Sequence, residues 1–208
     1  MEKARTSFLT VTQAGGPFEI KELGSRFLSY LYPMASAAEA DSLIGELRKS
    51  HHDATHVCTA LRLWRDGDEY VRHNDDGEPA GTAGAPILDE IRRRGCFNLL
   101  VGVVRYFGGT KLGTGRLRRA YGRSARAVLD GAVPVVHVLH RRAAVTIPFD
   151  FTGDMMRIVR RFSIRIVRQT YGEEGVVMEM SVPLGSLQMV ERAVSEHSLG
   201  RVRLTVLE

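Results

Sequence analysis

The chain has 208 residues, of which 44% are hydrophobic and 25% charged, and its formal net charge is +5. This size and composition predict a soluble globular protein with one large domain or two small ones. They exclude a protein that spans a membrane with helices, because no apolar run approaches the ~18 residues that a span needs. Met1–Thr12 lacks the features of a secretory signal, so we expect a cytoplasmic protein with reduced cysteines and no membrane partner.

Residue patterns in the first third of the chain predict strands and one helix. Phe8–Ile20 reads as extended segments that are broken at Gly15–Pro17. Polar and apolar residues alternate in Ser25–Tyr32 and in His56–Trp64, as they do in half-buried strands. Ser36 suits the N-cap of a helix that runs to about Ser50. A turn at Arg65–Asp68 then predicts a hairpin that returns through Glu69–His73.

The middle of the chain predicts a strand and a helix on either side of a glycine-rich loop. Asn74–Pro86 reads as a long loop, and a short helix follows over Ile87–Arg94. Phe97–Val104 is a continuous apolar run of the kind found in a buried strand. After the glycine-rich loop, Thr114 suits the N-cap of a helix that runs to about Asp130.

The last 70 residues predict a second domain. The pattern there is strand, helix, strand, strand, helix, strand, at Ala144–Phe149, Gly153–Phe162, Ile164–Thr170, Val176–Val182, Ser186–His197 and Val202–Val206. This βαββαβ order is typical of a ferredoxin-like domain. The sequence therefore predicts an α+β protein with domains at residues 1–138 and 139–208.

The excess positive charge is concentrated around the glycine-rich loop. Ile91–Leu129 contains ten basic residues and no acidic one, which leaves 19 basic against 24 acidic residues elsewhere. In the helix after the loop, arginines at 116, 119, 123 and 126 recur at helical spacing, opposite an apolar stripe. This pattern favours an anionic partner on one face of the protein. The alternative is a solvated arginine-rich helix.

The glycine-rich loop is a candidate anion site. Glycines permit a close backbone approach, and the free amides at a helix start attract negative charge. The glycine spacing matches neither a P-loop nor a dinucleotide fingerprint. The residues that we expect to contact phosphate or nucleic acid are Arg105, Gly108, Gly109, Lys111, Gly113, Thr114, Gly115, Arg116, Arg119 and Arg123.

Three acidic residues on the preceding loop, Asp75, Asp76 and Glu78, are candidates to support those cations. Such a cluster could bind a hard metal or act as general acid and base. The favoured alternative is a structural turn whose carboxylates cap backbone amides or pair with arginines. His56 and Cys58 lack the spacing of a zinc site, so we expect a hydrogen-bonded histidine beside a core thiol. No catalytic residue, metal or cofactor is assigned.

Several motifs, taken together, resemble the IMPACT/YigZ family. They are Asp75–Pro79, Gly81–Gly84, Arg105–Gly109 and Leu112–Gly115, together with Ile20–Lys21, Ser25–Phe27 and Ala54–Cys58, and they span roughly residues 18–131. The C-terminal part is similar to the second domain of the two-domain bacterial members. One departure is that Arg116 and Arg118 stand where the family pattern carries a glycine and a small apolar residue.

The resemblance implies a fold and a role. The first domain would be an α/β sandwich like the second domain of a small-subunit ribosomal protein, and the second would resemble a C-terminal domain of elongation factor G. Eukaryotic relatives regulate translation. We therefore expect a factor that binds RNA or the ribosome, without settling whether any reaction occurs. One alternative is a metal-assisted hydrolase or phosphate-handling enzyme that uses the three carboxylates. The other is a regulator that binds an acidic protein partner.

Overall fold

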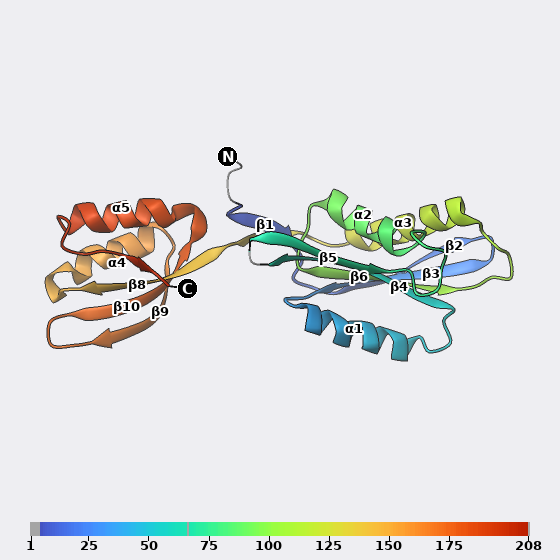
Figure 1. Cartoon of the computed structure of the whole chain (residues 1–208), viewed down its shortest axis with the longest axis horizontal. Helices are drawn as coiled ribbons and strands as arrows, with labels where there is room; N and C mark the ends of the chain where they lie inside the picture. The colour runs from blue at the N-terminus through green and yellow to red at the C-terminus, as the bar shows by residue number, and fades with distance from the viewer. Residues whose placement is uncertain (1–4, 66, 208) are drawn as a thin grey trace. The chain divides into compact units, whose positions relative to one another are not determined.

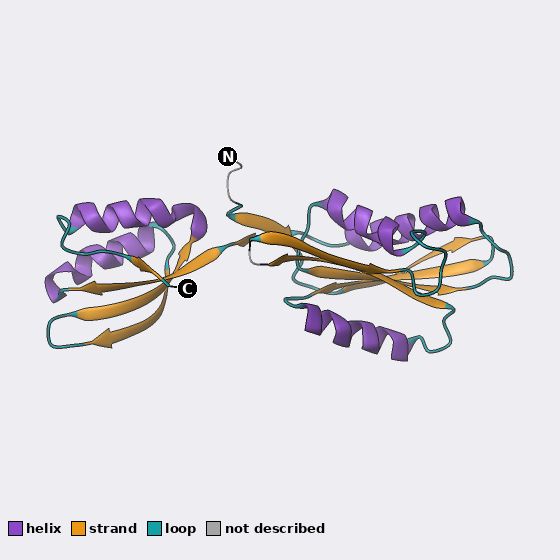
Figure 2. Cartoon of the chain, in the orientation of Figure 1, coloured by secondary structure: helices purple, strands orange, loops and turns teal. Residues whose placement is uncertain are grey.

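The computed structural model describes residues 5–65 and 67–207. These residues form two compact units of mixed α+β structure (Figure 2). The first unit is Phe8–His137, and the second comprises the chain from Val138 onward together with the described residues before Phe8. Residues 1–4 and 208 of the two predicted domains lie outside the described part of the chain.

A five-stranded antiparallel sheet forms the centre of the first unit. Its strands, in spatial order, are β2 (Gly15–Glu22), β3 (Ser25–Pro33), β6 (Leu99–Tyr106), β4 (His56–Arg65) and β5 (Asp68–Asn74). The apolar strand β6 lies in the middle, where seven of its eight residues are buried. The predicted hairpin joins β4 to β5, but Asp66 of its turn lies outside the described residues.

Helices cover both faces of this sheet (Figure 1). On one face lie α2 (Gly84–Arg94) and α3 (Thr114–Asp130), and on the other lies α1 (Ala37–Ser50). The predicted apolar stripe of α3 is confirmed, because Leu117, Tyr121 and Val128 are all buried in the main core. Its arginines at 116, 119, 123 and 126 are exposed, as the helical period predicts.

Two predicted helix caps have different outcomes. Ser36 caps α1 as predicted, since its hydroxyl accepts a hydrogen bond from the Glu39 amide at 3.1 Å. The prediction for Thr114 is wrong: Gly113 occupies the N-cap position of α3, and Thr114 is the first helical residue. The φ of Gly113 is +71°, a conformation that favours glycine over threonine.

Strand boundaries also differ from the predictions. β6 begins at Leu99 and not at Phe97, because Asn98 has a φ of +59° and its amide bonds the Arg62 carbonyl at 2.7 Å. The predicted break at Gly15–Pro17 corresponds to a shift in the register of β2 against β3 between Gly15 and Phe18, although the strand itself runs from Gly15 to Glu22. A two-stranded ribbon of β1 (Ser7–Thr10) and β7 (Val135–Val138) was not predicted as a pair.

The second unit confirms the predicted βαββαβ order. The elements are β8 (His140–Ile147), α4 (Thr152–Arg161), β9 (Arg165–Tyr171), β10 (Val176–Pro183), α5 (Leu187–His197) and β11 (Thr205–Val206). Short 3₁₀ turns at Phe149–Phe151 and Leu184–Ser186 precede the two helices. The antiparallel sheet has the order β11-β8-β10-β9, and both helices lie on one of its faces (Figure 1). No helix among the residues described in either unit is long and apolar enough to cross a bilayer.

Candidate functional site

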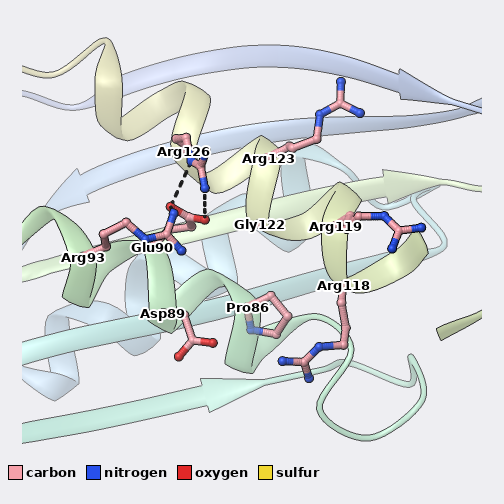
Figure 3. Close-up of a pocket in the computed structure, with 9 residues that line it drawn as sticks. All are labelled: Pro86, Asp89, Glu90, Arg93, Arg118, Arg119, Gly122, Arg123 and Arg126. Atoms are coloured by element: carbon pink, nitrogen blue, oxygen red, sulfur yellow. Dashed lines mark hydrogen bonds and ion pairs between the residues drawn. The ribbon is translucent and has the colours of Figure 1, made fainter. Parts of the chain in front are cut away.

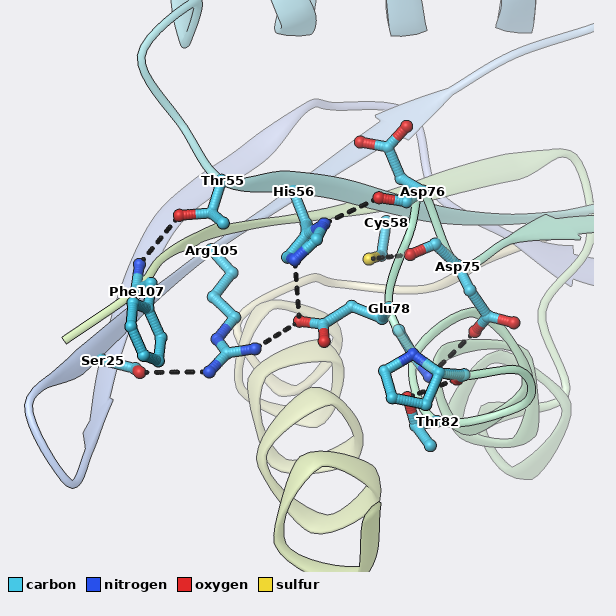
Figure 4. A network of polar contacts seen from close by, with 12 residues as sticks. Ser25, Thr55, His56, Cys58, Asp75, Asp76, Glu78, Thr82, Arg105 and Phe107 are labelled. Carbon is cyan, nitrogen blue, oxygen red and sulfur yellow. Dashed lines mark hydrogen bonds and ion pairs between the residues drawn. The ribbon is translucent and has the colours of Figure 1, made fainter. Parts of the chain in front are cut away.

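Arg105 lies inside the first unit, where it forms an ion pair with Glu78 (Figure 4). Its Nη1 donates to Glu78 Oε1 at 2.6 Å, and the hydroxyl of Tyr121 donates to the same oxygen at 2.7 Å. Its Nη2 donates to Ser25 Oγ at 3.3 Å. The side chains of Arg105 and Glu78 are only 6% and 3% exposed. Their charges neutralise each other in the interior, so Arg105 offers little to a ligand on the surface.

His56 and Cys58 adjoin this pair, and the prediction of a hydrogen-bonded histidine beside a core thiol is confirmed, with backbone carbonyls as their partners. His56 Nδ1 bonds the carbonyl of Asp76 at 2.7 Å, which fixes the proton on that nitrogen in the neutral ring. The Cys58 thiol donates to the carbonyl of Asp75 at 3.0 Å. Burial raises the pKa of Cys58 to about 12 and also raises the pKa of Tyr121. Neither group is therefore ionised enough at neutral pH to act as a nucleophile.

The two aspartates of the same loop bind backbone amides. Asp75 Oδ1 accepts from the amides of Ala83 and Gly84 at 2.9 and 2.8 Å, at the start of α2, and its Oδ2 accepts from Gly81 at 2.8 Å. Burial acts to raise the pKa of Asp75, but these three amides outweigh it and hold the pKa below its usual value. This arrangement is the structural turn that the sequence favoured.

Asp76 is also engaged on both oxygens. Its Oδ2 accepts from the amide of Val57 at 2.7 Å, and its Oδ1 pairs with Arg48. Among the residues that the structure describes, no group of three or more histidines, cysteines and acids is arranged to hold a metal ion. The three carboxylates therefore stabilise the loop, and their geometry gives no support to a metal-assisted hydrolase.

The glycine-rich loop packs against the β2–β3 hairpin. The amides of Phe107 and Gly108 donate to Thr55 Oγ1 at 3.0 Å and to Ser25 Oγ at 3.2 Å. A Cβ on Gly108 would lie 1.9 Å from the carbonyl carbon of Gly24, so this glycine permits a close approach of two backbones. Both amides therefore donate to side chains of the protein and are not free to bind an anion. Arg105 bonds the same Ser25 Oγ as the Gly108 amide does, so it contacts this loop as a buried structural partner.

The exposed arginines gather on a different surface, which we call the arginine face. It consists of Arg93 on α2 and Arg116, Arg118, Arg119, Arg123 and Arg126 on α3. Five of the six line a groove between the two helices (Figure 3). Of the residues predicted from the sequence, this surface retains Arg116, Arg119 and Arg123. Gly109, Lys111, Gly113, Thr114 and Gly115 form the exposed turn that precedes it.

Three carboxylates neutralise part of the arginine face. Glu22, at the end of β2, lies 3.9 Å from the Arg116 guanidinium and 3.4 Å from that of Arg123. Glu90 on α2 pairs with Arg93 at 2.6 Å and with Arg126 at 3.0 Å. Asp89 lines the same groove. The face keeps a surplus of positive charge because six arginines share these three acids.

Arg118 and Arg119 differ from the other arginines of the face in their contacts. Arg118 donates to the carbonyl of Gly81 at 2.6 Å. In the part of the chain that the structure describes, neither Arg118 nor Arg119 forms an ion pair with a carboxylate. Sequence reasoning left Arg93, Arg118 and Arg126 out of the site. Helical spacing was the available signal for Arg126, but only the packing of α2 on α3 adds Arg93.

Fold and surface together define a class: a two-unit α+β protein with a basic surface and, among its described residues, no cluster arranged to hold a metal ion. The family model "Impact N-terminal domain" matches residues 23–129. The chain is 34% identical to the IMPACT family member YvyE of Bacillus subtilis, over 97% of this chain and 94% of that protein. It is 39% identical to the IMPACT family member YigZ of Escherichia coli, over 91% and 92% of the two chains.

The chain therefore belongs to the IMPACT family, as its motifs indicated. A solved structure described as that of a hypothetical protein is 25% identical to this chain and covers 98% of both chains, with a TM-score of 0.71. That likeness extends over both units.

Proposed function

We propose that the protein is a cytoplasmic factor that binds RNA or the ribosome and influences translation, with the arginine face contacting backbone phosphates. The surplus of arginines over carboxylates on one surface carries this proposal. A guanidinium-rich surface attracts a polyanion, and binding is favoured by the release of condensed counterions. The role in translation comes from the family resemblance, as do the likenesses of the units to domains of a ribosomal protein and of elongation factor G.

The arrangement of the arginines suits a strand of phosphates better than a set of bases. Arg116 and Arg126 are about 15 Å apart along the axis of α3, at 1.5 Å per residue, which is long enough to meet several phosphates. None of the described residues that line the groove in this face is aromatic, so the groove lacks the platforms on which unpaired bases stack. Phosphate contacts position a nucleic acid without reading its sequence. We therefore expect little sequence preference.

A salt titration of RNA binding tests the proposal. The variant carries Arg116→Gln, Arg119→Gln and Arg123→Gln, which are all exposed, so the fold should be preserved. If each arginine meets one phosphate, the slope of log affinity against log salt should fall in magnitude by about 2–3. Fluorescence anisotropy with a labelled RNA measures that slope.

A matched control removes three arginines from the second unit: Arg142→Gln, Arg157→Gln and Arg192→Gln. Each forms an ion pair on the surface, with Glu179, Asp154 and Glu196 respectively. Because each triple variant loses three arginines, the net charge of the protein changes equally in both. An equal loss of slope in the two triple variants would mean that net charge, and not the arginine face, controls binding. Retained binding to an acidic protein without RNA binding would favour a protein partner.

A further inference from the structure

The groove in the arginine face has room for a compact ligand. Its volume is about 280 Å³, which is just below the ~300–1,000 Å³ range of ordinary small-molecule pockets. Pro86 and Asp89 on α2 and Gly122 on α3 line its middle, with arginines on both sides (Figure 3). The groove is therefore suited to a small anionic group.

Charge is unevenly distributed along the interface between α2 and α3. Glu90 holds Arg93 and Arg126 together, and these three residues also line a neighbouring hollow of about 300 Å³. In that second hollow, Arg94 lies 3.5 Å from Asp130, so its charge is balanced. The first groove shares Glu90, Arg93 and Arg126 with that hollow and adds three arginines, at 118, 119 and 123, against one further acid, Asp89. An anion should therefore prefer the first groove.

Gly122 is a residue that helix formation does not explain. A glycine inside a helix is less favourable than alanine. Packing does not require it, because a Cβ at this position would lie 3.6 Å from Glu90 Oε1 and 4.0 Å from Pro86 Cβ, both ordinary contact distances. What the glycine does provide is a floor without a side chain in the part of the groove that Glu90 and Pro86 also line.

We infer that this groove is a binding site for a compact phosphate group, of the size of a phosphomonoester or a diphosphate, which would lie against Gly122. Arg118, Arg119 and Arg123 are exposed and can turn toward it; in Figure 3 the last two extend away from Gly122 on different sides. Arg126 stays fixed to Glu90 through two hydrogen bonds of 3.2 and 3.0 Å and closes one end of the groove. The inference rests on the proposed function in that both assign phosphate binding to this face. The group is either one phosphate of RNA or part of a free phosphate compound.

The test uses the full-length protein and inorganic pyrophosphate as the probe in calorimetry. Gly122→Leu should abolish pyrophosphate binding by filling the groove, and Gly122→Ala should weaken it several-fold. Gly122→Ala should also raise the midpoint of thermal unfolding by about 2–4 °C, since alanine favours the helix. Arg119→Gln should lower the affinity about tenfold through the loss of a charge-assisted hydrogen bond.

Gly45 provides a matched control. It lies inside α1, and a Cβ there would meet nothing within 4 Å. Gly45→Ala and Gly45→Leu should stabilise the helix in the same way and leave pyrophosphate affinity unchanged. A loss of binding that also occurs in the Gly45 variants would overturn the inference, as would binding that Gly122→Leu leaves intact or an absence of pyrophosphate binding in the unchanged protein.

Measuring RNA binding in the same variants separates the two proposals. If pyrophosphate competes with RNA and Gly122→Leu weakens the binding of both ligands, the groove binds a phosphate of RNA. If Gly122→Leu removes pyrophosphate binding and leaves RNA binding unchanged, the groove binds a free phosphate compound. If RNA does not bind but pyrophosphate binds in a manner that depends on Gly122, the proposed function is refuted and the phosphate-binding site in the groove is supported.

Discussion

Replacing Glu78 with glutamine should strongly destabilise the first unit. The change removes a charge that is 3% exposed and leaves the Arg105 guanidinium, 6% exposed, without its carboxylate. Ser25 is the other hydrogen-bond partner found for that guanidinium among the described residues, and the Nε atom of Arg105 has none. Removal of one partner from a buried pair costs about 3–5 kcal/mol. We expect about 3 kcal/mol, because the glutamine oxygen can still accept from Tyr121.

Urea unfolding followed by fluorescence measures this loss. Trp64, the single tryptophan of the chain, lies on β4 in the same unit as the pair, so its signal reports that unit. A loss of about 3 kcal/mol is a large share of the 5–15 kcal/mol that stabilises a typical protein. Glu196→Gln, which breaks an exposed pair with Arg192, should cost far less, because solvent screens that pair.

A double variant distinguishes the cost of an unpaired buried charge from the cost of a change in side-chain shape. Glu78→Leu with Arg105→Met removes both charges, and it should be more stable than Glu78→Gln because no ion is left unpaired. The reasoning would be refuted if Glu78→Gln cost no more than Glu196→Gln. It would also be refuted if the double variant were the least stable of the three.

Three further changes have defined outcomes. Glu22→Gln should strengthen RNA binding by about two- to fivefold in anisotropy, because it frees two arginines; a weaker affinity would contradict this. Asp75→Asn should cost about 1–2 kcal/mol near neutral pH, because the amide nitrogen that replaces Oδ2 cannot accept the hydrogen bond from the Gly81 amide. Because folding lowers the pKa of Asp75, its contribution is present above about pH 3.9 and disappears as the pH falls through the folded value. A difference from the unchanged protein that stays constant down to pH 2 would argue against that assignment. Gly108→Ala should destabilise the protein more than Gly109→Ala, since only the former places a Cβ against Gly24; equal losses of thermal stability would count against the close packing.

Periodicity predicted the elements of this fold well because it depends on local chemistry. The stripe of α3 and the order of the second unit follow from apolar residues at helix or strand spacing. The errors occur where backbone conformation decides the boundary. The turn into α3 has a left-handed residue at Gly113, and the start of β6 follows one at Asn98. Neither conformation can be read from hydrophobic pattern.

The candidate site was predicted less completely because it depends on tertiary packing. A window from Ile91 to Leu129 contains no acid, yet Glu90 lies one residue before it and Glu22 is brought in by β2. Arg105 has the sequence context of a loop cation, but the folding of Glu78 onto β6 turns it into a buried structural residue. Charge counts along a chain therefore locate a basic region without showing which of its members reach solvent.

The residues before Phe8 have a consequence for dissecting this protein. The carbonyl of Thr6 accepts a hydrogen bond from the amide of Leu139 at 2.9 Å, and the carbonyl of Leu139 accepts one from Leu184 at 2.8 Å. The C-terminal unit is thus assembled from both ends of the polypeptide. A fragment that starts at residue 139 would leave the Leu139 amide without its acceptor, and so would a deletion that removes Thr6.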